Sequence, residues 1–464
     1  MRYLVRALCL VLLGAVLFVP VRAEDPIDEG KPAYTEAEAQ AYIQQIAPLV
    51  EQVTCCPFTK LPPVKLVTRA EMVPILAADL RPQLQAQMPE QPPAQVEKLA
   101  TNTAEEMACI LLGKYGFASK TLYLLPGNLL PLMQLAKVKP AEQTDILRLI
   151  IAHELTHALQ DQQVDLSAHI AAAAASPDRL MAYNAVMEGH AMLVQEKVGK
   201  LLKLEDVAQE FADKLVGGVP ELEDPLLSMM AKVQQQVYTD IYLGGRDFMS
   251  WQAQHDNTAA VWRMLANPPA TTAMIFHPER YAPGLPRGRD YAAVLQRLDD
   301  HLGAQPWRIV RNMELGEMAL RSTYAGVPEK TRTALLGNID HTQSLQCSTG
   351  KVVASVTLMT LRDGTQAGQM IDQLEAVARE NIAKLRDSAM ATVSDPTFDT
   401  LTDPRLPLAR RLRYTVAAEG DAKRFLIARI ANGNALVEID TIDVPLSDDD
   451  LLGIAKLVFF RLQE

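Results

Sequence analysis

The chain has 464 residues, of which 48% are hydrophobic and 22% are charged. This length exceeds that of one typical domain, and the hydrophobic content is sufficient for a sizeable core. The formal net charge of −11 argues against a nucleic-acid partner, and the sequence offers no cluster of basic residues for an anionic membrane surface.

The first 23 residues have the pattern of a secretory signal peptide. Arg2 and Arg6 form a short basic region, an apolar run covers residues 7–20, and Val21-Arg22-Ala23 resembles a cleavage site. The apolar run is short for a membrane span of about 20 residues, so an uncleaved anchor is the weaker alternative. The pattern predicts export, to the periplasm or the medium, and no membrane association once the signal peptide is removed.

Four cysteines remain beyond this segment, at positions 55, 56, 109 and 347. An exported chain meets an oxidising compartment, where disulfide bonds form. We expect one of the adjacent Cys55 and Cys56 to bond to Cys109, and buried free thiols are the alternative.

The first part of the mature chain is expected to alternate helices with short strands. Helices are predicted at 35–53, 69–80 and 95–115, and strands at 64–68 and 120–125. Thr35 is a favourable N-cap for the first helix.

The next predicted helix carries an H-E-x-x-H motif, His153-Glu154-Leu155-Thr156-His157. Histidines four residues apart lie on one helical face, so two neutral imidazoles can bind one zinc ion. Glu154 lies beside them, where its carboxylate can accept a proton from water. The alternative is a surface helix with two solvated histidines.

The third ligand is expected from elsewhere in the chain. Gln160 and Gln163 occupy the positions where a metzincin has glycine and histidine. A helix predicted over 177–203 carries Glu188 on an apolar stripe, where an unpaired carboxylate would be costly. Glu188 is therefore the predicted third ligand, and Glu196 is the rival.

The sequence H-E-L-T-H-A, followed by a helix with E-G-x-A at Glu188, resembles the thermolysin-like gluzincins. The resemblance implies a catalytic Zn²⁺ bound by His153, His157 and Glu188, with Glu154 as general base toward a zinc-activated water. It also implies that the strand at 120–125 borders the cleft and can pair with an extended substrate, with an ordinary core strand as the alternative. The spacing of 31 residues from His157 to Glu188 is longer than in thermolysin.

Residues 224–266 are predicted to be mostly helical. A Tyr-x-x-Gly helix, an Asn-Pro-Pro turn and the segment His277-Pro-Glu-Arg-Tyr281 follow one another. This order resembles a group of uncharacterised bacterial secreted zinc peptidase-like proteins. Together with the motifs at His153 and Glu188, the resemblance covers roughly residues 60–285. A hydrolase needs donors for a developing oxyanion, and His277 and Tyr281 are the candidates, with capping and packing roles as the alternative. His190 is expected outside the ligand set.

The sequence pattern changes from about residue 335. Strands are predicted at 351–361, 409–418, 423–431 and 434–441, with helices at 366–386 and after Ser447. This order predicts a small domain whose helices pack on one face of an antiparallel sheet.

The sequence therefore predicts an α+β protein in three parts. These are the signal peptide (1–23), a mainly helical gluzincin-like metallopeptidase domain with a small sheet (24–330) and a C-terminal α+β accessory domain (335–464). The predicted function is zinc-dependent hydrolysis of peptide bonds in peptide or protein substrates. A catalytically silent zinc-binding envelope protein and an amidase acting on cell-wall material are the alternatives.

Overall fold

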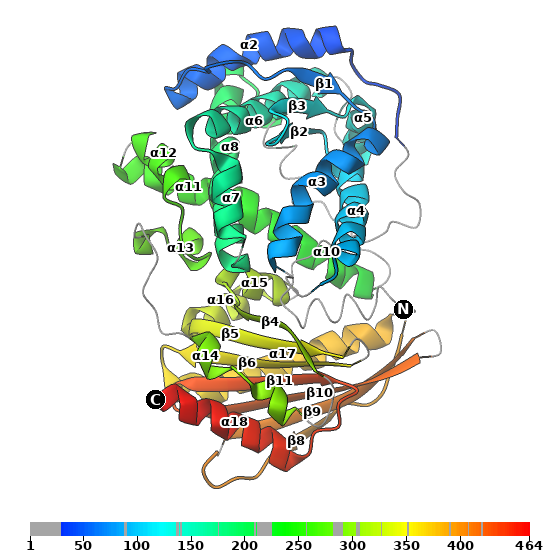
Figure 1. The fold of residues 1–464 in the computed structure, drawn as a ribbon, viewed down its shortest axis with the longest axis vertical. Helices are drawn as coiled ribbons and strands as arrows, with labels where there is room; N and C mark the ends of the chain where they lie inside the picture. The colour runs from blue at the N-terminus through cyan, green and yellow to red at the C-terminus, as the bar shows by residue number, and fades with distance from the viewer. Residues whose placement is uncertain are drawn as a thin grey trace. The chain divides into compact units, whose positions relative to one another are not determined.

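The structure is a computed structural model with an α+β fold (Figure 1). It describes residues 29–464 except 88–90, 136–138, 140–141, 175, 208–209, 211–224, 257, 282–290, 303–306, 326, 350–351, 389–390, 407 and 419–420. The predicted signal peptide lies outside the described residues. In the part of the chain that is described, no helix has the length and apolar character that crossing a membrane requires.

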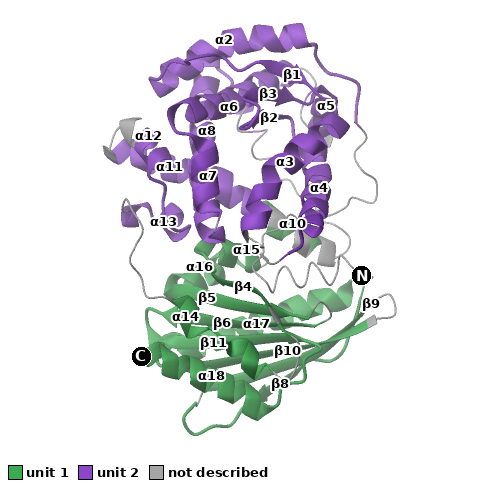
Figure 2. Cartoon of the chain, viewed as in Figure 1, with its two compact units in different colours: residues 1–19, 221–236, 286–464 green, residues 20–220, 237–285 purple. Residues whose placement is uncertain are grey.

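The chain forms two compact units (Figure 2). Unit 2 comprises residues 20–220 and 237–285, and unit 1 includes residues 221–236 and 286–464. The residues expected to form the accessory domain all belong to unit 1, which also takes in residues 286–334.

Unit 2 begins with helices around a small sheet. Its first elements are α2 (Glu36–Thr54), β1 (Val64–Leu66), α3 (Arg69–Gln87), α4 (Pro93–Ile110), β2 (Gly113–Gly116), β3 (Thr121–Leu124) and α5 (Pro126–Leu135). Thr35 caps α2 as expected, in a capping box with Glu38. The strand order is β1-β3-β2, with β1 parallel and β2 antiparallel to the central β3.

The helix expected over 95–115 ends earlier than predicted. It stops at Ile110, and Tyr115 lies in strand β2. A Cβ atom at Gly113 would lie 3.1 Å from the side chains of Glu154 and Ile150. Because glycine has no side chain, strand β2 can lie against the helix that carries Glu154.

That helix is α6 (Gln143–Gln163), which is followed by α7 (Leu166–Ala173) and α8 (Pro177–Leu202). Helix α8 begins at residue 177 as the sequence predicts, and the structure has Ser176 as its N-cap and Pro177 at the first position. The main core of unit 2 combines apolar side chains of α2, the sheet, α6 and α8, among them Ile43, Leu122, Ile151, Leu155 and Val194. Each such side chain contributes about 1.5–3 kcal/mol when fully buried, so the core holds α6 and α8 together.

The remaining elements of unit 2 follow the end of α10 (Pro225–Tyr238). They are a π-helix, η2 (Thr239–Gly244), then α11 (Gly245–Asp256), α12 (Thr258–Ala266), α13 (Ala273–Phe276) and η3 (Pro278–Arg280). Helix α11 and η2 pack against α8.

Unit 1 is built on a sheet with the strand order β4-β5-β6-β11-β10-β9-β7, in which β8 pairs with β9. The strands are β4 (Arg308–Glu314), β5 (Ile339–Ser348), β6 (Val353–Leu361), β7 (Thr392–Val393), β8 (Thr397–Thr400), β9 (Leu408–Ala418), β10 (Asp421–Asn432) and β11 (Ala435–Ile442). The helices are α14 (Tyr291–Val294), η4 (Leu298–His301), α15 (Glu317–Thr323), α16 (Glu329–Asn338), η5 (Gly364–Gln366), α17 (Ala367–Asp387) and α18 (Asp448–Gln463).

The expectation that the helices of this domain share one face of the sheet is wrong. Val437 and Ile439 of β11 pack in one cluster with α18, whereas Leu436 and Ile442 pack in clusters with α17. Successive residues of a strand point to opposite faces. Helices α17 and α18 therefore cover opposite faces of the sheet.

The prediction of a disulfide bond between Cys109 and Cys55 or Cys56 is also wrong, because all four described cysteines are free thiols. Cys55 lies at the C-cap of α2 with φ of 54°. The sulfur of Cys109 is directed back to the carbonyl of Glu105 within its own helix, 3.3 Å away.

Candidate metal centre

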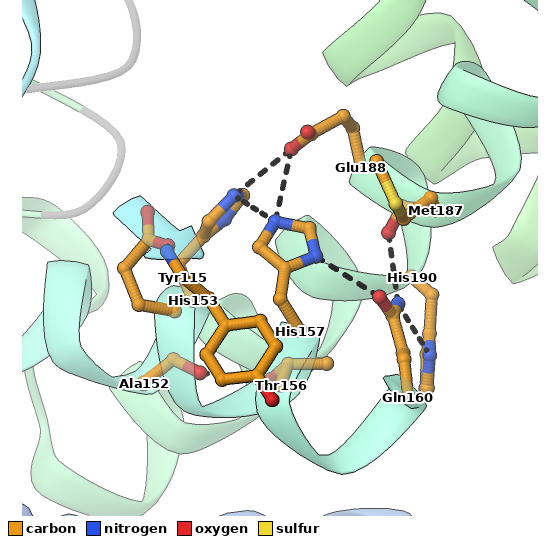
Figure 3. A network of polar contacts seen from close by, with 10 residues as sticks. Tyr115, Ala152, His153, Thr156, His157, Gln160, Met187, Glu188 and His190 are labelled. Atoms are coloured by element: carbon orange, nitrogen blue, oxygen red, sulfur yellow. Dashed lines mark hydrogen bonds and ion pairs between the residues drawn. The ribbon is translucent and has the colours of Figure 1, made fainter. Parts of the chain in front are cut away.

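Helices α6 and α8 bring His153, His157 and Glu188 together (Figure 3). The Nε2 atoms of His153 and His157 lie 3.0 Å and 3.3 Å from the same carboxylate oxygen, Oε2 of Glu188. The two Nε2 atoms lie 3.2 Å apart. In the described part of the chain, this is the one group of three histidine, cysteine or acidic side chains that converges in this way, with ligand atoms within 4.8 Å of one another.

The rival ligand, Glu196, is not part of this group. Its carboxylate pairs with Lys200 at 2.6 Å on the exposed side of α8. Glu188 instead lies on the side of α8 that faces α6, and its side chain is 16% exposed. The structure therefore brings together the three residues predicted as ligands, although His157 and Glu188 are 31 positions apart in the sequence.

The electrostatics of the three groups are strongly coupled. Burial alone would lower the pKa of His157, but the Glu188 carboxylate and its hydrogen bond raise it to about 9. Burial alone would raise the pKa of Glu188, whereas the two histidines hold it well below its usual range.

Two imidazole nitrogens and a carboxylate oxygen are also the ligands that zinc prefers, so this donor set fits a zinc ion.

Glu154 lies at the edge of the same group. It is 8% exposed, and its Oε2 atom accepts a hydrogen bond of 2.6 Å from the backbone N–H of Tyr115. The hydroxyl of Tyr115 donates to Asp161, 2.9 Å away on the same helix, α6. Strand β2 therefore orients Glu154, through a contact that the sequence prediction of a helix at Tyr115 missed.

Tyr242 is a further residue of this site that the sequence analysis missed as a functional candidate. It lies in the π-helix η2, and its ring centroid is 6.1 Å from that of His153. Burial raises the pKa of Tyr242 well above its usual range, and the Glu188 and Tyr238 side chains raise it further. The hydroxyl therefore keeps its proton and is available as a hydrogen-bond donor.

Two glycines allow the segment with Tyr242 to approach α8. A Cβ atom at Gly189 would lie 2.1 Å from the backbone of Gly245, and one at Gly245 would lie 2.0 Å from the carbonyl oxygen of Ala185. The two backbones are in direct contact at this crossing. The glycines at 189 and 245 were the sequence signal for it, since close backbone approach requires residues without side chains.

His277 and Tyr281 have partners in their own loop. His277 lies between α13 and η3, with Nδ1 4.0 Å from the Glu279 carboxylate. The hydroxyl of Tyr281 donates to the carbonyl of Asn267 at 2.7 Å, and its ring packs edge-on against Phe248. The expected oxyanion role of these two residues stays a prediction.

His190 lies outside the ligand set, in the core of the unit. Burial lowers its pKa to about 3, with a further contribution from the positive charge of His157. Its ring lies edge-on to Trp262, with centroids 5.0 Å apart.

Comparisons with known proteins give little further information. No protein-family model matches the chain, and no curated protein matches it in sequence. One solved structure, described as "a putative hydrolase with a novel fold" from Chloroflexus aurantiacus, is similar with a TM-score of 0.40 and 16% identity. The match covers 59% of this chain and 95% of that one.

Proposed function

We propose that the protein is a zinc-dependent hydrolase that cleaves peptide bonds. The observation that carries this proposal is the convergence of His153, His157 and Glu188 to within 4.8 Å, with Glu154 beside them. The gluzincin-like order of the motifs supports a peptide substrate. The export predicted from the N-terminal sequence belongs to the same proposal and would place the enzyme outside the cytoplasm.

The three ligands would hold Zn²⁺ with the Nε2 atoms and one carboxylate oxygen. When bound, zinc supplies Lewis-acid chemistry, which polarises a carbonyl group and makes water a stronger acid. Hydrolysis also needs a group that accepts a proton from water and returns it to the leaving amine. Glu154 has this role in our proposal. Its Oε2 atom is held by the Tyr115 N–H, which sets the position of the carboxylate before substrate arrives.

Tyr242 would donate a hydrogen bond to the oxyanion that develops on the scissile carbonyl. Its protonated hydroxyl and its position beside His153 support this role. Such a donor, held in place before the reaction, stabilises charge that appears only in the transition state.

Metal analysis of the purified protein tests the binding step. We expect one zinc per chain in the wild type and in Glu196→Ala, a matched control on the exposed side of α8, and little or none in Glu188→Ala. Equal zinc content in the two variants would show that Glu188 is not a ligand.

Activity against a broad peptide library tests the chemistry. Glu154→Gln keeps the size and hydrogen bonding of the side chain but removes the base, so it should bind zinc and lose activity by a factor of about 10²–10⁴. A variant as active as the wild type would contradict the mechanism. A wild type that binds zinc but cleaves no peptide would favour a binding protein or an amidase with another substrate.

A further inference from the structure

We propose that Gln160 is a positioning residue, which presents His157 to the metal and ties this ligand to the backbone next to Glu188. The inference rests on the proposed zinc site and extends it to a residue outside the ligand set. It concerns the side of His157 that faces away from the metal.

Gln160 is completely buried, three residues after His157 on α6. Its Oε1 atom lies 2.9 Å from Nδ1 of His157. Its Nε2 atom donates to the carbonyl of Met187 at 2.9 Å and lies 3.1 Å from Nδ1 of His190 (Figure 3). The amide oxygen and both amide hydrogens therefore each have a partner, as a buried amide requires.

The orientation of this amide follows from the chemistry of its partners. The Met187 carbonyl can only accept a hydrogen bond, so it must face the NH₂ group of Gln160. The oxygen of the amide then faces Nδ1 of His157, which has to carry a hydrogen. His157 accordingly keeps its Nε2 lone pair for the metal whenever the ring is neutral.

The second hydrogen of the amide fixes the tautomer of a second histidine, His190. His190 must accept it, so Nδ1 of His190 carries a lone pair. Gln160 thus selects the proton positions of two histidines, one on each helix.

The hydrogen bond to Met187 links α6 and α8, the two helices that supply the proposed ligands. Met187 directly precedes Glu188, so its carbonyl belongs to the same turn of α8 as the third ligand. A hydrogen bond from α6 to this carbonyl restrains the distance between His157 and Glu188. A metal-ligating histidine is commonly oriented by a hydrogen bond to its other nitrogen, and loss of that partner typically lowers metal affinity about 10–100-fold.

The test uses the full-length protein and Gln160→Met, which keeps the size of the side chain and removes its hydrogen bonds. The matched control is Gln163→Met, at an exposed position of the same helix. Zinc affinity is measured by competition with a chelator. We expect about a 10–100-fold loss for Gln160→Met and wild-type affinity for the control.

A second readout separates positioning from a general effect on folding. In zinc-loaded protein labelled with ¹⁵N-histidine, the Nδ1 proton of His157 should give a hydrogen-bonded, downfield resonance. It should move upfield in Gln160→Met. In Gln160→Glu it should move further downfield, because a carboxylate is a stronger acceptor, while the melting temperature falls because Met187 and His190 lose their donor.

The outcomes distinguish this inference from the proposed function. A wild type that binds no zinc overturns both. A wild type that binds zinc, with Gln160→Met binding it equally tightly, overturns the positioning role alone. If Gln160→Met does not fold, the test relies on Gln160→Glu. An unchanged His157 Nδ1 proton resonance in that variant overturns the positioning role.

Discussion

Tyr242 lies beside a ligand of the proposed metal, but its hydroxyl is not part of the ligand set. Replacing it with phenylalanine removes one hydrogen-bond donor and leaves the ring in place. We expect Tyr242→Phe to bind zinc normally, to keep its KM and to lose about 10²–10³ in kcat, as when other oxyanion donors are removed. Steady-state kinetics with a cleaved peptide would measure this.

Tyr238→Phe is the control for that experiment, because Tyr238 lies one turn earlier, with its ring centroid 6.0 Å from that of Tyr242. It should have nearly wild-type kcat. A larger loss of kcat in Tyr281→Phe than in Tyr242→Phe would show that the oxyanion donor is Tyr281, as predicted from the sequence.

Asp440 is a buried residue of unit 1 with an unusual carboxyl group. It is 7% exposed, and its Oδ1 atom has no hydrogen-bond partner among the described residues. Its neighbour Glu438 pairs with Arg429 instead. Burial raises the pKa of Asp440 well above its usual range, and the Glu438 carboxylate raises it further. Asp440 is therefore protonated in the folded state at pH values where the unfolded chain has lost this proton.

The sign of the pH dependence follows from this difference. The contribution of Asp440 to stability is complete below its unfolded pKa of about 3.9, and is lost as the pH rises toward the folded pKa. We expect Asp440→Asn to match the wild-type melting temperature near pH 4 and to exceed it at pH 8. The exposed Asp372→Asn is the control, and a mutant less stable than wild type at pH 8 would contradict the protonated carboxyl.

At the scale of elements, the crossing of α8 with α11 depends on Gly189 and Gly245. Gly189→Ala places a Cβ atom 2.1 Å from the Gly245 backbone, so the two helices have to separate. We expect the free energy of unfolding to fall by about 1–3 kcal/mol, as in other overpacked cores. The proposed peptidase activity should fall as well, because Tyr242 moves away from His153.

A glycine in an open position provides the comparison. Gly453 lies within α18, and a Cβ atom there would have nothing within 4 Å. Gly453→Ala should stabilise the protein by about 0.5–1 kcal/mol, through the lower entropy of the unfolded chain. Thermal unfolding and activity assays measure both variants. If Gly189→Ala and Gly453→Ala were equally stable, the crossing of α8 with α11 would tolerate a side chain at Gly189.

For the whole molecule, the division into two units leads to a prediction about truncation. His153, His157, Glu188, Glu154 and Tyr242 all belong to unit 2, and the sheet of unit 1 has hydrophobic clusters of its own. A chain that ends at residue 285 should therefore retain one zinc per molecule. Metal analysis and circular dichroism would check this. Loss of zinc from a truncated chain that still folds would mean that unit 1 supports the site.

The features predicted correctly from the sequence depend on short stretches of chain. The spacing of His153 and His157 places both rings on one face of α6 in any helix, and the start of α8 at Ser176 and Pro177 follows from capping. The apolar stripe around Glu188 also pointed to the carboxylate that lies beside both histidines. Helical geometry relates residues three or four apart, so these relations could be read without knowledge of the rest of the fold.

The other features depend on contacts between segments that are distant in the sequence. The position of Tyr115 in β2 depends on pairing with β3 and on the space that Gly113 leaves beside Glu154. Tyr242 reaches His153 because two backbones touch at Gly189 and Gly245, and Gln160 finds its partners on another helix. Composition and periodicity do not specify which surfaces meet, because an apolar face or a glycine can pack against many partners. Packing in three dimensions selected one set of them, and it thereby decided the surroundings of the motif that the sequence had already located.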